Sequence, residues 1–136
     1  MATNPLQDSD TAHCIRNCLT THKACLETLH YMLTQKSTHF QGKHVTLLQL
    51  CADTSDLSAK MMIADVEFHQ QSCALCFELC QACAEECERY PEDAELRRCA
   101  DLCRQCAESC QAMMGMTVTM ASSARARKPQ ETSRQI

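Results

Sequence analysis

The chain has 136 residues, which is the length of one domain. Leu, Ile, Val and Phe supply only 22 of them, but Ala, 8 Met and 13 Cys replace the missing apolar volume, and a formal net charge of −4 is too small to favour disorder. With 2 Gly and 3 Pro, the chain lacks the frequent turns of a β-sandwich or β-barrel. Composition therefore predicts an all-α protein.

The N-terminal segment is polar and acidic. Residues 1–14 have neither the basic region nor the apolar region of a secretory signal, and no apolar run reaches the roughly 18 residues that span a bilayer. We therefore expect a cytoplasmic protein without a membrane partner, in a compartment where thiols stay reduced. Thirteen cysteines, an odd number, also cannot all pair into disulfides within one chain.

The first predicted helix follows a polar lead, residues 1–9, and runs from about Thr11 to Gln35. Its cysteines share one face and are Cys14, Cys18 and Cys25. Its apolar residues lie beside that face, where we expect them to seal contacts with neighbouring helices; they are Ile15, Leu19, Leu26 and Leu33.

The second predicted helix runs from about His44 to Ile63, after a loop of residues 36–43. The positions that continue the register of its single cysteine are His44, Leu48, Cys51, Ser55, Ser58 and Met62. This helix therefore supplies the fewest thiols. Asp65 is the predicted N-cap of the next helix.

The third predicted helix spans about Val66 to Arg89, and its thiols follow the spacing +3, +4, +3, +4. They are Cys73, Cys76, Cys80, Cys83 and Cys87. This is the a/d spacing of a heptad repeat, which directs every thiol along one line.

The fourth predicted helix follows a turn at residues 90–93 and ends near Met114, where Gly115 offers a C-cap. Its thiols continue the same spacing and are Cys99, Cys103, Cys106 and Cys110. Residues 119–136 carry a local charge of +3 without hydrophobic periodicity, which predicts a disordered basic tail. Binding of nucleic acid by this tail is the less favoured interpretation, and we expect no nucleic-acid partner.

Helices of about 20 to 25 residues joined by short loops run antiparallel to their neighbours. The predicted fold is an antiparallel four-helix bundle over residues 10–118, with a cysteine-lined core.

The spacing of the thiols along the helices indicates which metal ion they can bind. Residues three or four apart on a helix have Cβ atoms about 5–6 Å apart, so two thiolates can clamp one small ion. Sites with two or three soft sulfurs suit Cu(I), and bridging thiolates would hold on the order of one ion per cysteine. A zinc-binding protein is the alternative, disfavoured because 13 thiols do not divide into four-thiolate sites and a continuous helix presents them poorly.

Purely structural or catalytic roles fit the cysteines less well. Ordinary core positions favour Leu, Ile and Phe, which bury more apolar area than a thiol. The Cys-Pro run of ferredoxins is absent from the sequence, which disfavours an iron–sulfur protein. Cys73-x-x-Cys76 lacks the βαβ context of a thiol oxidoreductase, so we expect no enzyme. A copper chaperone or a thiol-based metal sensor remains the alternative from another functional class.

The cysteine pattern resembles that of the cytosolic copper storage proteins. The motifs that carry the resemblance are Cys14-x3-Cys18-x6-Cys25, Cys73-x2-Cys76-x3-Cys80-x2-Cys83-x3-Cys87 and Cys99-x3-Cys103-x2-Cys106-x3-Cys110. The resemblance implies storage of many Cu(I) ions inside the bundle, restraint of free copper in the cytosol, assembly as a homotetramer, and exchange with a copper donor or acceptor protein. Ser55 and Ser58 depart from it, because they occupy register positions that could have been thiols.

Antiparallel helices also bring one group of soft side chains to one end of the bundle. His69 lies four residues before Cys73, and Met62 and Met113 continue the thiol lines of their helices. We add these three to the predicted ligands, because a thioether binds Cu(I) without deprotonation and can pass an ion onward. His22, His30 and His39 are predicted to be surface residues, and His44 is a slightly better candidate at the opposite end.

Overall fold

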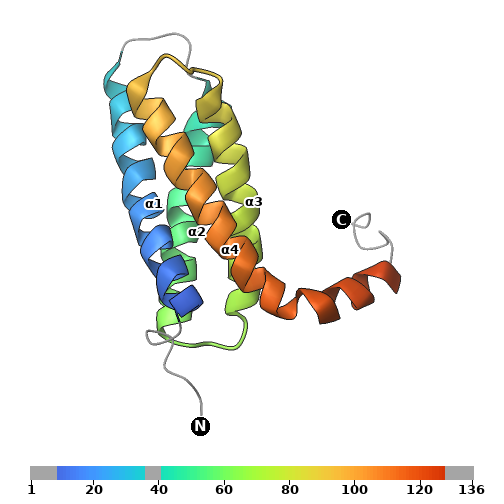
Figure 1. Ribbon diagram of the computed structural model, residues 1–136. Coiled ribbons are helices and arrows are strands. Elements are labelled where there is room, and N and C mark those ends of the chain that lie inside the picture. Colours follow the sequence, from blue (N-terminus) through green and yellow to red (C-terminus); the bar gives the residue numbers. More distant parts are fainter. Residues whose placement is uncertain (1–8, 36–40, 128–136) are drawn as a thin grey trace.

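The computed structural model describes residues 9–35 and 41–127, except for the side chains of residues 115–127. Four helices make up almost all of this part: α1 (Ser9–Thr34), α2 (Gly42–Ile63), α3 (His69–Glu88) and α4 (Ala94–Arg127). They alternate in direction and form an antiparallel bundle (Figure 1). The predicted fold is confirmed.

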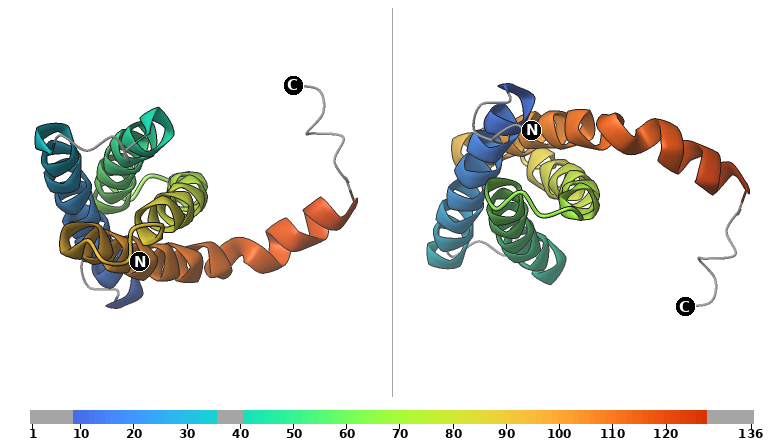
Figure 2. Two further views of the ribbon diagram at one scale, coloured as in Figure 1. Left: turned by 90° about the horizontal axis from the view of Figure 1, so that it is seen from above. Right: turned by 90° about the horizontal axis from the view of Figure 1, so that it is seen from below.

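Each helix packs against two others, in the cyclic order α1, α2, α3, α4. Among the described residues, the diagonal pairs do not meet, so the four helices surround one central axis (Figure 2). The start of α1, the end of α2 and the start of α3 lie at one end of the bundle, and α4 leaves the bundle at that end (Figure 1). We call this the methionine end, because Met62 and Met113 lie there.

The turn between α2 and α3 corrects one prediction. Asp65 does not cap α3, which begins at His69 after Phe68. Its φ of 57° is left-handed, and it stands just beyond the C-cap of α2, Ala64. The N–H of Asp65 donates to Met62 at 3.1 Å and that of Val66 to Met61 at 3.1 Å, which is the bond pattern of a Schellman motif. Asp65 therefore ends one helix rather than starting the next.

The opposite turn follows the prediction, since α4 begins directly after residues 90–93. The Oδ1 atom of Asp93 accepts hydrogen bonds from the N–H groups of Glu95 and Leu96, at 3.0 and 3.1 Å, as an N-cap does. The hydroxyl of Tyr31 on α1 donates to Oδ2 of the same carboxylate at 2.7 Å. Asp93 thus starts α4 and also fixes it to α1.

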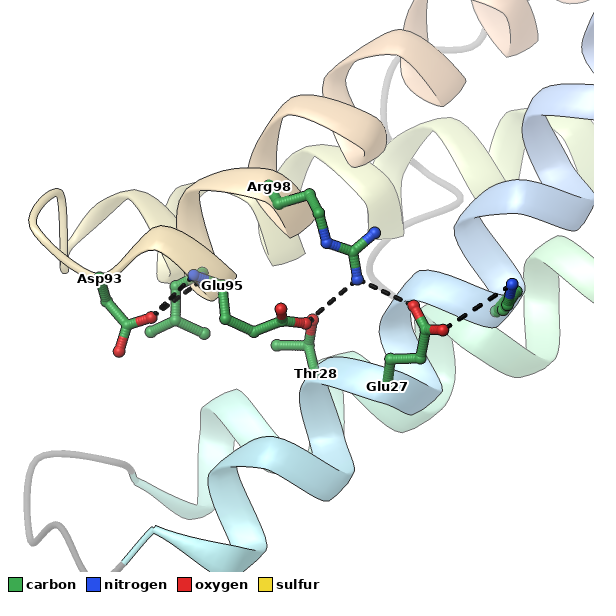
Figure 3. Close-up of polar contacts among 7 residues, drawn as sticks. Glu27, Thr28, Asp93, Glu95 and Arg98 are labelled. Atoms are coloured by element: carbon green, nitrogen blue, oxygen red, sulfur yellow. Dashed lines mark hydrogen bonds and ion pairs between the residues drawn. The ribbon is translucent and has the colours of Figure 1, made fainter.

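A polar network continues this attachment along α1 and α4 (Figure 3). Arg98 donates to Glu27 across the interface at 2.8 Å and to Glu95 at 3.1 Å. Buried Thr28 donates to the second of these carboxylates at 2.9 Å. Arg98 is 45% exposed, so its ion pairs contribute little stability, while the buried hydroxyl fixes the packing of the two helices.

The end of α4 was predicted wrongly. The helix continues through Gly115 to Arg127 instead of stopping near Met114. Residues 119–127 of the predicted tail are thus helical, and residues 128–136 lie outside the described part. One glycine lowers helix propensity by about 1 kcal/mol, which by itself is too little to end a long helix.

The leucines of α1 are a third correction. Ile15 is buried, but Leu19, Leu26 and Leu33 are exposed, because the thiols occupy the stripe that faces the axis. Leu50 and Leu57 add two exposed leucines on α2. None of the described helices has the length and hydropathy needed to cross a bilayer.

Candidate metal centre

All thirteen cysteines are free thiols, and none has any exposed surface. The prediction that the thiols face the bundle axis is confirmed. Few large apolar side chains share this interior: Leu48, Met62, Leu96 and Met113 are the largest that are almost fully buried. The core of the molecule is therefore mainly sulfur.

Thiols of different helices contact one another at the axis. Between α1 and α4, the sulfur atoms of Cys14 and Cys110 are 3.8 Å apart and those of Cys18 and Cys106 are 3.7 Å apart. Cys76 of α3 lies 4.0 Å from Cys106. Neighbouring sulfurs at these distances can move together around one small ion.

The middle of the bundle has its own contacts. Cys51, the single thiol of α2, lies 3.5 Å from Cys80 of α3. Within α3, Cys76 and Cys80 are 3.8 Å apart, as their spacing of four residues predicts. Contacts within a helix and between helices therefore join the thiols into one continuous row.

Three groups of thiols have all their sulfur atoms within 4.8 Å of one another. They are Cys18, Cys76, Cys106 and Cys110; Cys25, Cys51, Cys83 and Cys103; and Cys83, Cys87 and Cys99. The second group takes one thiol from each helix. The prediction concerned the thiols of one continuous helix; it did not consider the four-sulfur groups that several helices form together.

Hydroxyl groups occupy the positions of thiols in the C-terminal half of α2. Ser55 and Ser58 are fully buried, and their oxygen atoms lie 3.5 and 3.6 Å from the sulfurs of Cys76 and Cys73. Ser58 also lies 3.2 Å from Ser72 of α3. The structure thus places both serines on the thiol face, where the register predicts them.

The predicted soft ligands gather at the methionine end. The Met62 sulfur lies 3.9 Å from the thiol of Cys73, and the Met113 sulfur lies 3.8 Å from the hydroxyl of Thr11. His69 is half-buried, and its Nδ1 atom is buried without a hydrogen-bond partner in the described structure. These side chains border the thiol row; whether they bind copper stays a prediction.

Sequence reasoning left His44 out of the ligand set, but it is buried at the opposite end. Its Nε2 atom lies 3.2 Å from the thiol of Cys87. Its ring stacks on Tyr90, with centroids 6.1 Å apart. The signal was present in the register of α2, which continues from Cys51 through Leu48 to His44. We call this the histidine end.

The remaining histidines have different surroundings. His13 and His30 are exposed, and His39 lies outside the described residues. His22 is half-buried rather than fully at the surface, with Nδ1 2.8 Å from the carbonyl oxygen of Ala52 on α2. It links α1 to α2.

Close packing changes the pKa values of the thiols. Hydrogen bonds to Cys106 and Cys51, together with burial, hold the pKa of Cys80 well above its ordinary value. For Cys73, contact with Cys110 lowers the pKa, but Cys14 and burial outweigh it and raise the pKa to about 12. Contacts with Cys110 and Cys18 lower the pKa of Cys106 to about 6. Thiols this close titrate as a group, with some protons lost readily and others held.

Comparison with known families agrees with this geometry. The sequence profile of the copper storage proteins matches residues 7–115, which is most of the chain and all of the thiol row. The chain belongs to the copper storage protein family. Membership accounts for a core built of thiols, because soft sulfur ligands select Cu(I).

Individual relatives support the assignment. The cysteine-rich protein YhjQ of Bacillus subtilis is 35% identical over 80 residues, which cover 59% of this chain and 74% of that protein. The Cu(I)-bound copper storage protein BsCsp3 has a TM-score of 0.74 and 32% identity, over 77% of this chain and 98% of that chain. The Streptomyces lividans protein Ccsp, loaded with 10 copper equivalents, has a TM-score of 0.74 and 25% identity, over 79% of this chain and 85% of that chain. A further structure of a Streptomyces lividans relative describes a cytosolic copper storage protein with five coppers.

Proposed function

We propose that this chain stores Cu(I) in the cytoplasm, as a non-catalytic protein that holds many ions inside the bundle. The observation that carries the proposal is the continuous row of thirteen buried free thiols, which joins all four helices. Relatives loaded with several coppers and one described as cytosolic support it. Thiolates that bind copper in a buried row also keep it from reacting with other cell components.

The ligand set follows from the positions of the side chains. We propose the thirteen cysteines as the principal ligands, and Met62, Met113 and His69 as auxiliary ligands at the methionine end. His44 joins them at the histidine end, because its Nε2 atom lies within reach of any ion on Cys87. Each ion displaces a thiol proton and binds the folded chain, where the thiols are already gathered, more tightly than the unfolded chain, so loading stabilises the bundle.

An anaerobic titration of the reduced full-length protein with Cu(I), against a competing chelator, tests the proposal. We expect uptake on the order of one ion per cysteine, since bridging thiolates share their ions. Saturation at a single ion would instead indicate a copper chaperone or a thiol-based sensor, which needs one accessible site.

The role of the thiols as ligands has its own test. Replacing Cys76, Cys80 and Cys83 by Ser removes three adjacent thiols of α3, and we expect copper capacity to fall by several ions while the helical content remains. Ala84→Ser is the matched control, because it places a hydroxyl at a fully buried position of the same helix without removing a thiol. Equal capacity in the triple variant and the wild type would show that these thiols are structural.

We also propose that the chain assembles as a homotetramer. The exposed leucines of α1 and α2 support this, because Leu19, Leu26 and Leu33 recur every seven residues, as do Leu50 and Leu57. Light scattering during gel filtration measures the mass of the wild type and of Leu26→Lys/Leu50→Lys. We expect a tetramer and a smaller species respectively, and a monomeric wild type would contradict the proposal. A copper donor or acceptor protein would then meet the assembly at a bundle end.

A further inference from the structure

The thiol core contains no buried basic side chain apart from one imidazole. Among the residues whose side chains are described, no lysine or arginine is buried, and the charged or polar buried residues are threonines, serines, Glu86 and His44. Lys43 and Arg89 approach the core only at the histidine end, where they pair with Glu86 at 3.5 and 3.0 Å. Both cations are at least half exposed. Arg104 on α4 interacts electrostatically with Cys103, but it is 38% exposed and pairs with Glu88 at 2.8 Å. A negative charge formed in the middle of the bundle therefore has no buried cation beside it.

This charge distribution separates monovalent from divalent ions. When a thiol binds a monovalent ion, RSH + M⁺ gives RSM + H⁺, and the product is neutral. When four thiols bind a divalent ion, 4 RSH + M²⁺ gives [M(SR)₄]²⁻ + 4 H⁺, and two negative charges stay behind. Burial of an uncompensated charge is strongly unfavourable. The four-thiol groups have the sulfurs of a zinc site, but not the surroundings for its charge.

The histidine end differs from the rest of the row, because it offers a neutral ligand. His44 lies 3.2 Å from Cys87, which belongs to the group with Cys83 and Cys99. Two thiolates, one neutral imidazole and a divalent ion form a neutral set, with two protons released. The third thiol of the group can keep its proton.

We propose that the core selects its cargo by charge: the four-thiol groups take soft monovalent ions, Ag⁺ as well as Cu⁺, and soft divalent ions bind only at the histidine end, about one per chain. The inference rests on the proposed storage function and deepens it. Geometry alone would place a divalent ion elsewhere, in a four-thiol group such as Cys25, Cys51, Cys83 and Cys103. Selection by charge therefore predicts a divalent ion at the histidine end, whereas selection by geometry predicts it in a four-thiol group.

The experiment titrates the reduced full-length protein with Cu⁺, Ag⁺ and Cd²⁺ in parallel and counts bound ions after gel filtration. We expect the Ag⁺ count to match the Cu⁺ count and the Cd²⁺ count to stay near one. His44→Gln removes the imidazole, and we expect it to abolish Cd²⁺ binding. Cys51→Ser and Cys76→Ser each break a four-thiol group, and we expect both to leave the Cd²⁺ count unchanged.

A spectroscopic measurement keeps the test independent of any variant. ¹¹³Cd NMR of the wild type distinguishes mixed sulfur and nitrogen ligands, which we expect, from four sulfurs. Several Cd²⁺ per chain, a four-sulfur signal, or loss of Cd²⁺ in Cys76→Ser but not in His44→Gln would overturn the inference. An Ag⁺ count far below that of Cu⁺ would also overturn it. If Cu⁺ itself saturates at one ion, the storage function fails instead, so the two failures are distinguishable.

Discussion

Cysteine at every axial position of α3 lowers the apolar area that the apo core can bury. A thiol buries less surface than Leu or Ile, and hydrophobic stabilisation scales with the apolar area removed from water, at about 25 cal/mol per Å². The bundle retains large apolar side chains mainly near its ends, at Leu48, Leu96 and the three buried methionines. The residues that we propose as ligands therefore make the apo protein less stable than a leucine bundle of equal size.

One residue outside the core gives a direct stability prediction. Asp65 has the left-handed φ of 57°, a conformation that costs a residue with a Cβ about 1 kcal/mol or more. We expect Asp65→Gly to have a free energy of unfolding about 1 kcal/mol above that of Asp65→Ala, because only glycine adopts this conformation without strain.

Urea denaturation of the two apo variants measures the difference. The matched control is the neighbouring Ala64, whose φ of −80° is right-handed. There a change to glycine is expected to destabilise the bundle, because glycine loses more backbone entropy on folding. If both positions responded to glycine with the same sign, the Schellman geometry would not explain the sequence.

At the scale of one element, α2 is the helix that limits the thiol row. Three helices supply twelve thiols and α2 supplies Cys51 alone. Ser55 and Ser58 lie on its axial face, within 3.6 Å of thiols of α3. These hydroxyls hydrogen-bond with side chains of α3, but an oxygen is a poor ligand for Cu(I). In the half of the bundle toward the methionine end, thiols therefore come from α1, α3 and α4 only.

The serines allow a gain-of-function test. We expect Ser55→Cys/Ser58→Cys to raise copper capacity by about one or two ions, because both new thiols would join the existing row with little change in volume. The anaerobic Cu(I) titration measures the capacity. Thr54→Cys is a useful control, since Thr54 is buried on α2 but lies outside the register of Cys51. An unchanged capacity in the double variant would mean that α2 does not face the copper sites.

At the scale of the whole molecule, the sequence periodicity predicted which face of each helix lies toward the bundle axis. The thiol spacing of α3 and α4 alone indicates the axial faces, because side chains every three or four residues share one side of a helix. The thiol groups could not be predicted in this way, since Cys25, Cys51, Cys83 and Cys103 come together only once four helices are in register. The register of α2 places His44 on the axial face, but its contact with Cys87 depends on the packing of α2 against α3. Asp65 was predicted wrongly because aspartate favours both helix N-caps and left-handed C′ positions.

Loading of the whole core is expected to depend on pH. Neighbouring thiols and burial raise the pKa of Cys80, and Cys14 and burial raise that of Cys73, so these groups are protonated near neutral pH and each must lose a proton to bind copper. Since a raised thiol pKa favours the protonated form, the apparent Cu(I) affinity rises with pH, about tenfold per pH unit for each proton displaced. Chelator competition at about pH 6 and about pH 8 measures this slope. Affinity independent of pH would mean that the apo thiols are already ionised.

The two ends of the bundle are expected to differ in how copper reaches the row. At the histidine end, Tyr90 covers His44 and the bond between Tyr31 and Asp93 joins α1 to α4. At the methionine end, Met62 lies against Cys73, and the soft sulfur of Met113 and the half-buried ring of His69 lie near the start of the thiol row. Soft ligands that need no deprotonation bind Cu(I) and release it to thiolates, so we predict that copper enters here.

Stopped-flow loading from a weak Cu(I) donor tests this route. In His69→Ala/Met113→Leu, we expect slower loading, while the final copper count falls by no more than about one or two ions, because few of the sites use these ligands. Leu keeps most of the volume of the buried Met113, so the bundle is expected to remain folded. The matched variant at the other end is Met32→Leu, which replaces a buried thioether at the histidine end and is expected to load at the wild-type rate. Slower loading in that control, with an unchanged rate in the double variant, would place the route of copper at the histidine end instead.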